Sequence, residues 1–132
     1  MTAVVESASP ASSRVAKGAD DSMSKFFRAL GDPTRLRLLE FLMDGERSVS
    51  ECVEHAGLSQ GRVSIHLACL AGCGYISARR QGRWCYYMVA DPRVAELVLL
   101  ARSVARDNRA ELDACQRIDS KLRSGSASRS AC

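Results

Sequence analysis

Aromatic residues are scarce in this chain of 132 residues: Phe, Trp and Tyr together make up 5% of it. The core must therefore be built from Leu, Val and Ala, a composition that favours helices. No apolar run reaches the roughly 18 residues that a transmembrane helix needs. The first 21 residues also lack the apolar stretch typical of a signal peptide. We therefore expect a cytoplasmic protein that has no membrane partner.

Cysteine, in contrast, is abundant: the chain has six. A reducing compartment disfavours structural disulfides, so each cysteine is expected to be a small core residue or a functional thiol. The chain has no Cys-x-x-Cys pair, and no acid paired with a thiol beside a substrate pocket is evident. We therefore expect neither a thiol-based enzyme, such as an oxidoreductase or a mercury–carbon lyase, nor a small-molecule substrate.

The charge balance permits nucleic-acid binding without requiring it. Nineteen Lys and Arg against fifteen Asp and Glu give a formal net charge of +4. The basic residues Arg79, Arg80 and Arg83, together with Arg62, are expected to make one face positive.

Composition and capping residues divide the chain into three parts. Residues 1–20 are rich in Ser, Ala and Gly and predict a disordered arm, and residues 119–132 predict a flexible tail. Residues 21–118 form the single expected domain. The first helix is predicted over residues 22–31 and is ended by Gly31. The second is predicted from the N-cap Asp32 to about Gly45.

The next segments predict a DNA-reading unit. Ser48 and Glu51 form a capping box that opens a short helix closed by Gly57, and Ser59 caps a second, more polar helix. This spacing is typical of a helix-turn-helix, in which the second helix enters the major groove. Residues 75–89 then read as two strands around a turn near Gln81–Gly82, a wing with basic residues at its tip.

The last predicted helix covers residues 91–122 and carries an apolar stripe. A long striped helix beyond so small a domain favours dimerisation, so the expected fold class is mainly α with a small β-hairpin: a winged helix-turn-helix that forms a homodimer through its terminal helices. The stripe consists of Val94, Leu97, Val98, Ala101, Val104, Ala105 and Leu112.

Three stretches, "ALGDPTRLRLLEFL", "GLSQGRVSIHLACL" and "GRWCYYMV", carry a resemblance over about residues 22–118. They resemble the ArsR/SmtB family of winged-helix repressors. The resemblance implies a homodimer that binds a partly palindromic, double-stranded operator and leaves it when an inducer, often a metal ion, binds.

The second helix of the motif supplies most of the candidate DNA contacts. Gln60 and Arg62 are the best candidates for reading bases, whereas the serines and wing arginines are better suited to phosphates. Each could instead belong to a merely solvated face, and His66 is as well explained by a structural role. Ile65 departs from the polar residue frequent in the family; it could contact a thymine methyl or face the wing. The full predicted set is Ser59, Gln60, Arg62, Ser64, His66, Arg79, Arg80 and Arg83.

Two of the family's metal sites do not fit these residues. The arsenic-type site resembles a Cys-x-Cys at positions where this chain has Ser48 and Ser50, whose hydroxyls cannot replace thiolates for soft ions. The zinc or nickel site resembles paired Asp and His on the last helix, which has no histidine here. The resemblance that remains is to the cadmium- and lead-sensing branch, which implies the ligands Cys69, Cys73 and Cys115.

Residue types and spacing support this ligand set. Cys69 and Cys73 are four residues apart, so their Cβ atoms should lie roughly 5–6 Å apart on a helix, unless Gly72 ends it first. A third thiolate from the last helix would complete a trigonal sulfur site, suited to a soft divalent inducer such as cadmium, lead or mercury. Whether Cys115 would serve its own or the partner subunit stays open.

The other readings of the cysteines also stay open. Any of the three could simply be core, since free cysteine packs as a small hydrophobe. Cys52 and Cys85 are predicted to be core residues, and Cys132 to be an incidental thiol or an auxiliary ligand. The main alternative function is a thiol-redox repressor, in which Cys69 and Cys73 or Cys115 form a reversible disulfide. A metal-buffering protein would have no use for the wing.

Overall fold

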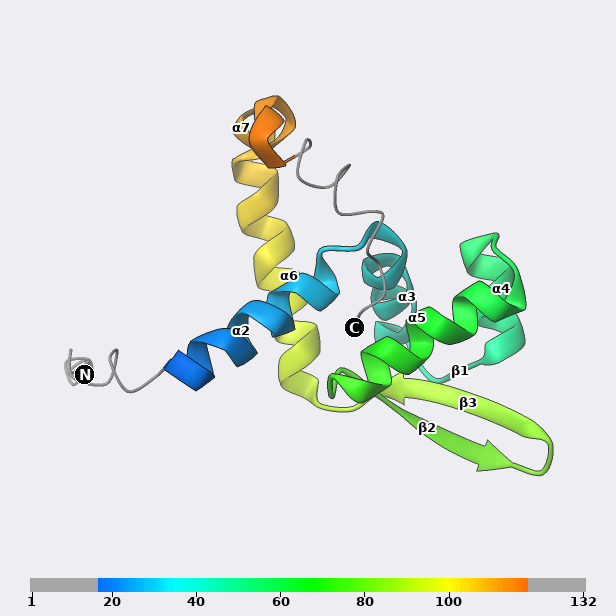
Figure 1. Ribbon diagram of the computed structural model, residues 1–132. Helices are drawn as coiled ribbons and strands as arrows, with labels where there is room; N and C mark the ends of the chain where they lie inside the picture. The colour runs from blue at the N-terminus through cyan, green and yellow to red at the C-terminus, as the bar shows by residue number, and fades with distance from the viewer. Residues whose placement is uncertain (1–16, 119–132) are drawn as a thin grey trace.

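The computed structural model describes residues 17–118, a mainly helical domain with one small sheet (Figure 1). The helices are α2 (Lys17–Leu30), α3 (Pro33–Met43), α4 (Val49–Ala56), α5 (Gln60–Gly72), α6 (Pro92–Asp107) and α7 (Arg109–Ala114). The strands β1 (Arg47–Ser48), β2 (Ile76–Gln81) and β3 (Trp84–Val89) form an antiparallel sheet in the order β1-β3-β2. The predicted fold class, a winged helix-turn-helix, is confirmed. Within the described residues no helix is both long and apolar enough to span a bilayer.

The first helix begins earlier than the sequence predicts. Helix α2 begins at Lys17, so the helix predicted from Ser22 starts earlier and takes in the last residues of the predicted arm. The predicted tail, 119–132, and the rest of the arm lie outside the described residues. The next helix begins as predicted: Asp32 accepts from the N–H groups of Thr34 at 2.8 Å and Arg35 at 3.1 Å, with Pro33 in the first turn.

The core lies between α3 and α5. Both helices direct a stripe of aliphatic side chains inward, and Cys52 of α4 and Tyr75 complete the fully buried set. Helix α5 therefore packs against α3 through its buried face. The core aliphatics are Leu38, Leu39, Leu42, Val63, Leu67 and Leu70.

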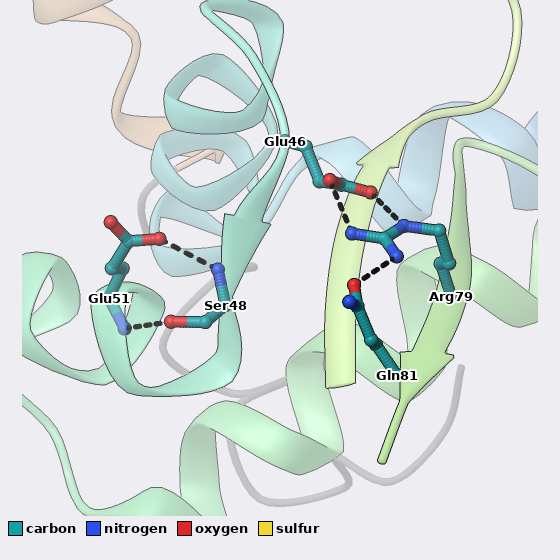
Figure 2. A network of polar contacts seen from close by, with 5 residues as sticks. All are labelled: Glu46, Ser48, Glu51, Arg79 and Gln81. Carbon is teal, nitrogen blue, oxygen red and sulfur yellow. Dashed lines mark hydrogen bonds and ion pairs between the residues drawn. The ribbon is translucent and has the colours of Figure 1, made fainter. Parts of the chain in front are cut away.

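The helix-turn-helix forms where its capping residues place it. The Ser48 N–H donates to Glu51 Oε1 at 2.8 Å and the Glu51 N–H donates to Ser48 Oγ at 3.1 Å, which is the predicted capping box (Figure 2). Gly57 ends α4 at φ 69°, a left-handed conformation that glycine adopts without steric cost. Ser59 then caps α5.

The wing is the β2–β3 hairpin, which turns at Gly82 and Arg83, one residue later than the predicted turn near Gln81–Gly82. Gly82 has φ 61° there. The sheet also contains β1, which the sequence did not predict; it pairs Ser48 with Tyr86 and Arg47 with Tyr87. This two-residue strand attaches the wing to the start of α4.

The last predicted helix is wrong as a single element. Helix α6 ends at Asp107, Asn108 has φ −111° and ψ 24°, and a short α7 follows. Asn108 Nδ2 donates to the Val104 carbonyl at 2.9 Å. An asparagine side chain that competes for backbone groups in this way favours a helix end over a helix interior.

The outer side of the terminal helices is apolar and uncovered in the single chain. It carries Leu99, Leu100 and Val104 on α6 and Leu112 and Ile118 at or beyond α7, all at least 47% exposed. Met23 and Phe27 on α2 are exposed as well.

Candidate functional site

Helix α5 exposes most of the predicted polar side chains to solvent. Gln60, Arg62 and Ser64 are exposed on α5, whereas the Ser59 hydroxyl accepts the Arg62 N–H at 3.3 Å and so caps the helix. Ile65, between them, is 70% exposed. The outward face of α5 therefore offers hydrogen-bond donors and acceptors together with one aliphatic side chain.

His66 is half-buried, whereas the other predicted DNA-contacting side chains of α5 are exposed. Its Nδ1 is buried and has no hydrogen-bond partner among the described residues. Burial lowers the pKa of its imidazole, an effect that the nearby Asp32 opposes. This position, between α5 and the start of α3, agrees with the structural reading of His66 better than with a base contact.

The three wing arginines differ in what surrounds them. Arg80 and Arg83 are exposed and make no ion pair within residues 17–118. Arg79, in contrast, forms a two-point ion pair with Glu46, and its Nη1 donates to Gln81 Oε1 at 2.8 Å (Figure 2). Sequence reasoning missed Glu46, because its partner is 33 residues away and only the unpredicted strand β1 brings the two together.

Cys69 and Cys73 lie at the C-terminal end of α5. The Cys73 N–H donates to the Cys69 carbonyl at 3.0 Å, so the helical spacing of four residues is kept even though α5 ends at Gly72. Cys69 is buried at 8% exposure and Cys73 is half-buried. Cys69 is also disulfide-bonded, so it must be reduced before its sulfur can act as a thiolate ligand.

Cys115 lies at the far end of the domain, directly after α7. It is a half-buried free thiol in an apolar groove of about 500 Å³. The groove is lined by Ala101, Val104, Ala105, Asn108, Glu111, Leu112, Cys115 and Ile118.

The single chain does not bring the three predicted ligands together. The Ala90 N–H donates to the Tyr75 carbonyl at 3.0 Å, which joins the segment after α5 to the segment before α6. Cys115 is separated from that junction by the 16 residues of α6, roughly 24 Å of helix. Within residues 17–118, no three His, Cys, Asp or Glu side chains are grouped closely enough to hold a metal ion.

The remaining described cysteines lie elsewhere in the domain. Cys52 is fully buried in the core, as predicted, and burial raises the pKa of its thiol to about 11. Cys85 is half-buried on β3, and burial together with the nearby Cys85 raises the pKa of the Tyr87 phenol. Cys132 lies outside the described residues.

Comparison with known proteins shows which family this chain belongs to. Residues 32–78 match the family described as "Bacterial regulatory protein, arsR family". A "Probable mercury resistance operon repressor" of Streptomyces lividans is 63% identical over 98 residues, covering 74% of this chain and 78% of that protein. The "HTH-type transcriptional regulator CmtR" of Mycobacterium tuberculosis is 39% identical over 92 residues, covering 67% and 78%.

A solved structure gives the same result for the fold. The homodimeric winged helix-turn-helix DNA-binding domain of a possible ArsR-family regulator from Mycobacterium bovis superposes with a TM-score of 0.66 at 32% identity. The match covers 70% of this chain and 85% of that one. The relatives and the fold are those of DNA-binding transcriptional regulators rather than enzymes, and this chain belongs to the ArsR family of bacterial regulatory proteins.

Proposed function

We propose that this chain is a soft-metal-responsive repressor that leaves its operator when Cys69, Cys73 and Cys115 bind the inducing ion. The observation that supports this proposal is the placement of Cys69 and Cys73 at the C-terminal end of α5, the second helix of the helix-turn-helix. Mercury is the first candidate inducer because the relative with 63% identity is named for mercury resistance. Cadmium and lead share the preference for thiolates and are the alternatives.

The repressor is proposed to act as a homodimer through its terminal helices. The exposed side chains Leu99, Leu100, Val104 and Leu112 form an apolar surface that water would otherwise meet. Contiguous exposed apolar surface of this kind marks a protein interface. The homodimeric relative from Mycobacterium bovis supports the same assembly.

The metal site is proposed to be shared between subunits. In one chain, α6 separates Cys115 from Cys69 and Cys73 by roughly 24 Å of helix. A two-fold axis that packs the α6 helices antiparallel would bring the far end of one subunit near the α5 end of the other. The partner's Cys115 could then join this subunit's Cys69 and Cys73.

The donor set fits a soft ion. Three thiolates suit cadmium, lead or mercury and are poor ligands for magnesium or calcium. Each thiol must lose its proton to bind, so metal affinity should fall as the pH falls. When bound, the ion would link α5 to the dimerisation helices, and the chain's own response is a changed spacing of the two reading heads.

Coupling between the two ligands must be reciprocal. If metal weakens operator binding by a given factor, the operator weakens metal binding by the same factor. Typical couplings of about 1–3 kcal/mol correspond to roughly 5-fold to 150-fold changes in affinity.

The test is release from the chain's own promoter DNA, followed by fluorescence anisotropy with the protein reduced beforehand. Mercury, cadmium, lead, zinc and a thiol oxidant are added separately. We expect release by one or more of the soft ions at about one equivalent per subunit, and none by zinc. Release by the oxidant alone would instead favour the thiol-redox repressor, for which the oxidised state of Cys69 is the specific observation.

Mixed dimers test the sharing of the site. The variants C73S and C115S should each bind the operator but ignore the metal. A dimer of one C73S and one C115S subunit contains one intact site only if the site crosses the interface. Recovered release in the mixture therefore supports the shared site, and continued repression by every mixture rejects it.

A further inference from the structure

We propose that Arg79 positions the wing rather than contacting DNA, and that Glu46 is the residue through which it does so. The wing's contacts to the operator are then Arg80 and Arg83. This inference rests on the proposed operator binding by the wing and does not involve the metal.

The Arg79 guanidinium is engaged on several sides. Its Nε donates to Glu46 Oε2 and its Nη2 to Glu46 Oε1, both at 2.8 Å, and Nη1 donates to Gln81 Oε1 at 2.8 Å. The guanidinium carbon lies 4.7 Å from the centre of the Tyr86 ring. A planar, two-point pairing of this kind fixes the direction of an arginine, which a single-point contact does not.

The sheet places Arg79 and Arg80 on opposite faces. Side chains alternate along β2, so Arg80 shares the face of Ile76, which is buried in the core beneath α5. Arg79 shares the other face with Gln81 and with its partner Tyr86. Arg80 therefore lies on the sheet face that is directed toward α5 and toward DNA bound there.

The charge of Arg79 is already compensated. Its hydrogen bonds keep the pKa of the Glu46 carboxyl below its ordinary value, so the carboxylate stays ionised at neutral pH. A phosphate would have to displace that carboxylate and leave it close to the DNA backbone. Arg80 and Arg83 meet no such competitor within residues 17–118.

Among the described residues, the wing has few other contacts that would fix its position on the domain. Beyond Ile76 the residues of β2 are exposed, and β1 contributes only two residues to the sheet. The Glu46–Arg79 pair joins β2, the outer strand of the wing, to the segment before β1 (Figure 2). The Arg79 guanidinium also lies over the ring of Tyr86 on β3. It therefore limits how far the hairpin can swing relative to α4 and α5.

The test uses metal-free full-length protein, promoter DNA and a range of salt concentrations. Each phosphate contact contributes about −0.9 to the slope of log affinity against log salt. Arg83→Gln, present in both subunits, should reduce that slope by about 1.8. Arg79→Gln should weaken binding about threefold at one salt concentration and leave the slope unchanged.

A charge swap separates bracing from contact. Arg79→Glu alone should weaken binding on the order of tenfold. Combining it with Glu46→Arg restores the ion pair and the wild-type net charge, and should return the affinity to within about threefold of wild type. Amide hydrogen exchange in β2 and β3 should speed up in Glu46→Gln and Arg79→Gln and return to the wild-type rate in the swap. Exchange in the α3 core should stay slow in these three variants and in Arg79→Glu.

Three outcomes would overturn the inference: a slope loss in Arg79→Gln equal to that of Arg83→Gln, tighter binding by Glu46→Gln, or a swap that binds no better than Arg79→Glu. If the wild type itself fails to bind the promoter, operator binding and this inference both fail. Wild-type binding without rescue by the swap overturns the inference alone.

Discussion

Replacing Tyr75 with Phe would remove one oxygen atom from the buried contact between α2 and the segment after α5. The Tyr75 ring is fully buried, lies 4.6 Å from the Phe26 ring centre, and donates its hydroxyl to the Phe26 carbonyl at 2.5 Å. The variant keeps the ring contact and loses the hydrogen bond. A net contribution of about 0.5–1.5 kcal/mol per such bond predicts that the free energy of unfolding falls by about 1 kcal/mol at neutral pH.

Alkaline pH should cancel this difference. Burial raises the pKa of the Tyr75 phenol above its ordinary value of about 10. Above that pH the unfolded chain releases the phenol proton while the folded chain keeps it, so the stability due to this group is present below about pH 10 and lost above it. One pH unit higher the loss is about 1.4 kcal/mol. Wild type and Y75F should therefore be about equally stable near pH 11.

Urea denaturation followed by far-ultraviolet circular dichroism, at about pH 7 and about pH 11, measures both quantities. Tyr86→Phe is the matched control, because its half-buried ring serves as the surface on which Arg79 lies. The reasoning is refuted if Y75F equals wild type at neutral pH, or if the difference is as large at pH 11 as at pH 7.

Three further predictions concern other parts of the domain. Burial raises the pKa of the Cys52 thiol to about 11, so less than about one molecule in a thousand holds it as thiolate at neutral pH. Brief treatment of reduced protein with iodoacetamide, followed by mass spectrometry, should therefore show label on Cys115 and none on Cys52. Equal labelling of the two cysteines would contradict the burial argument. Burial also lowers the pKa of His66, so the unfolded chain binds a proton that the folded chain refuses below about pH 6.5. The free energy of unfolding should fall as the pH drops through that window, less so in His66→Gln, and identical pH profiles would count against it. Leu112→Glu places a charge in the exposed apolar groove of each subunit and should give monomers in sedimentation velocity, whereas an unchanged dimer would move the interface elsewhere.

Local signals in the sequence were enough for the helix-turn-helix. Asp32, Ser48 and Ser59 each satisfy N–H groups within three residues, and Gly57 takes the left-handed conformation that ends α4. Such caps depend only on neighbours along the chain, so the boundaries of α3, α4 and α5 could be read directly. The hairpin turn at Gly82 is local in the same sense.

Features that depend on distant neighbours could not be read in this way. Strand β1 is two residues long and exists only because β3 lies beside it. The Glu46–Arg79 pair follows from that strand, so the sequence grouped Arg79 with Arg80 and Arg83 by charge alone. The break at Asn108 is local, but the apolar stripe continues past it and favoured one uninterrupted helix.

The candidate thiol site stays a prediction, and only its local spacing can be compared with the structure. The spacing of Cys69 and Cys73 along α5 is a local property, and the structure keeps it. The position of Cys115 relative to them is not local, because it depends on the length of α6 and on a second subunit. The sequence therefore proposes the three residues as ligands, and which subunits supply them stays open.

The unequal burial of the three sulfurs has a consequence for timing. An ion that reaches this protein carried by small cellular thiols must exchange its ligands one at a time, beginning with a sulfur that solvent can reach. Cys73 and Cys115 are half-buried, whereas Cys69 is only 8% exposed. If the proposed site binds metal in the reduced protein, capture by Cys73 and Cys115 precedes engagement of Cys69. Metal loading and release from DNA are then separate kinetic phases, and the rate of the second is set by how often the end of α5 opens.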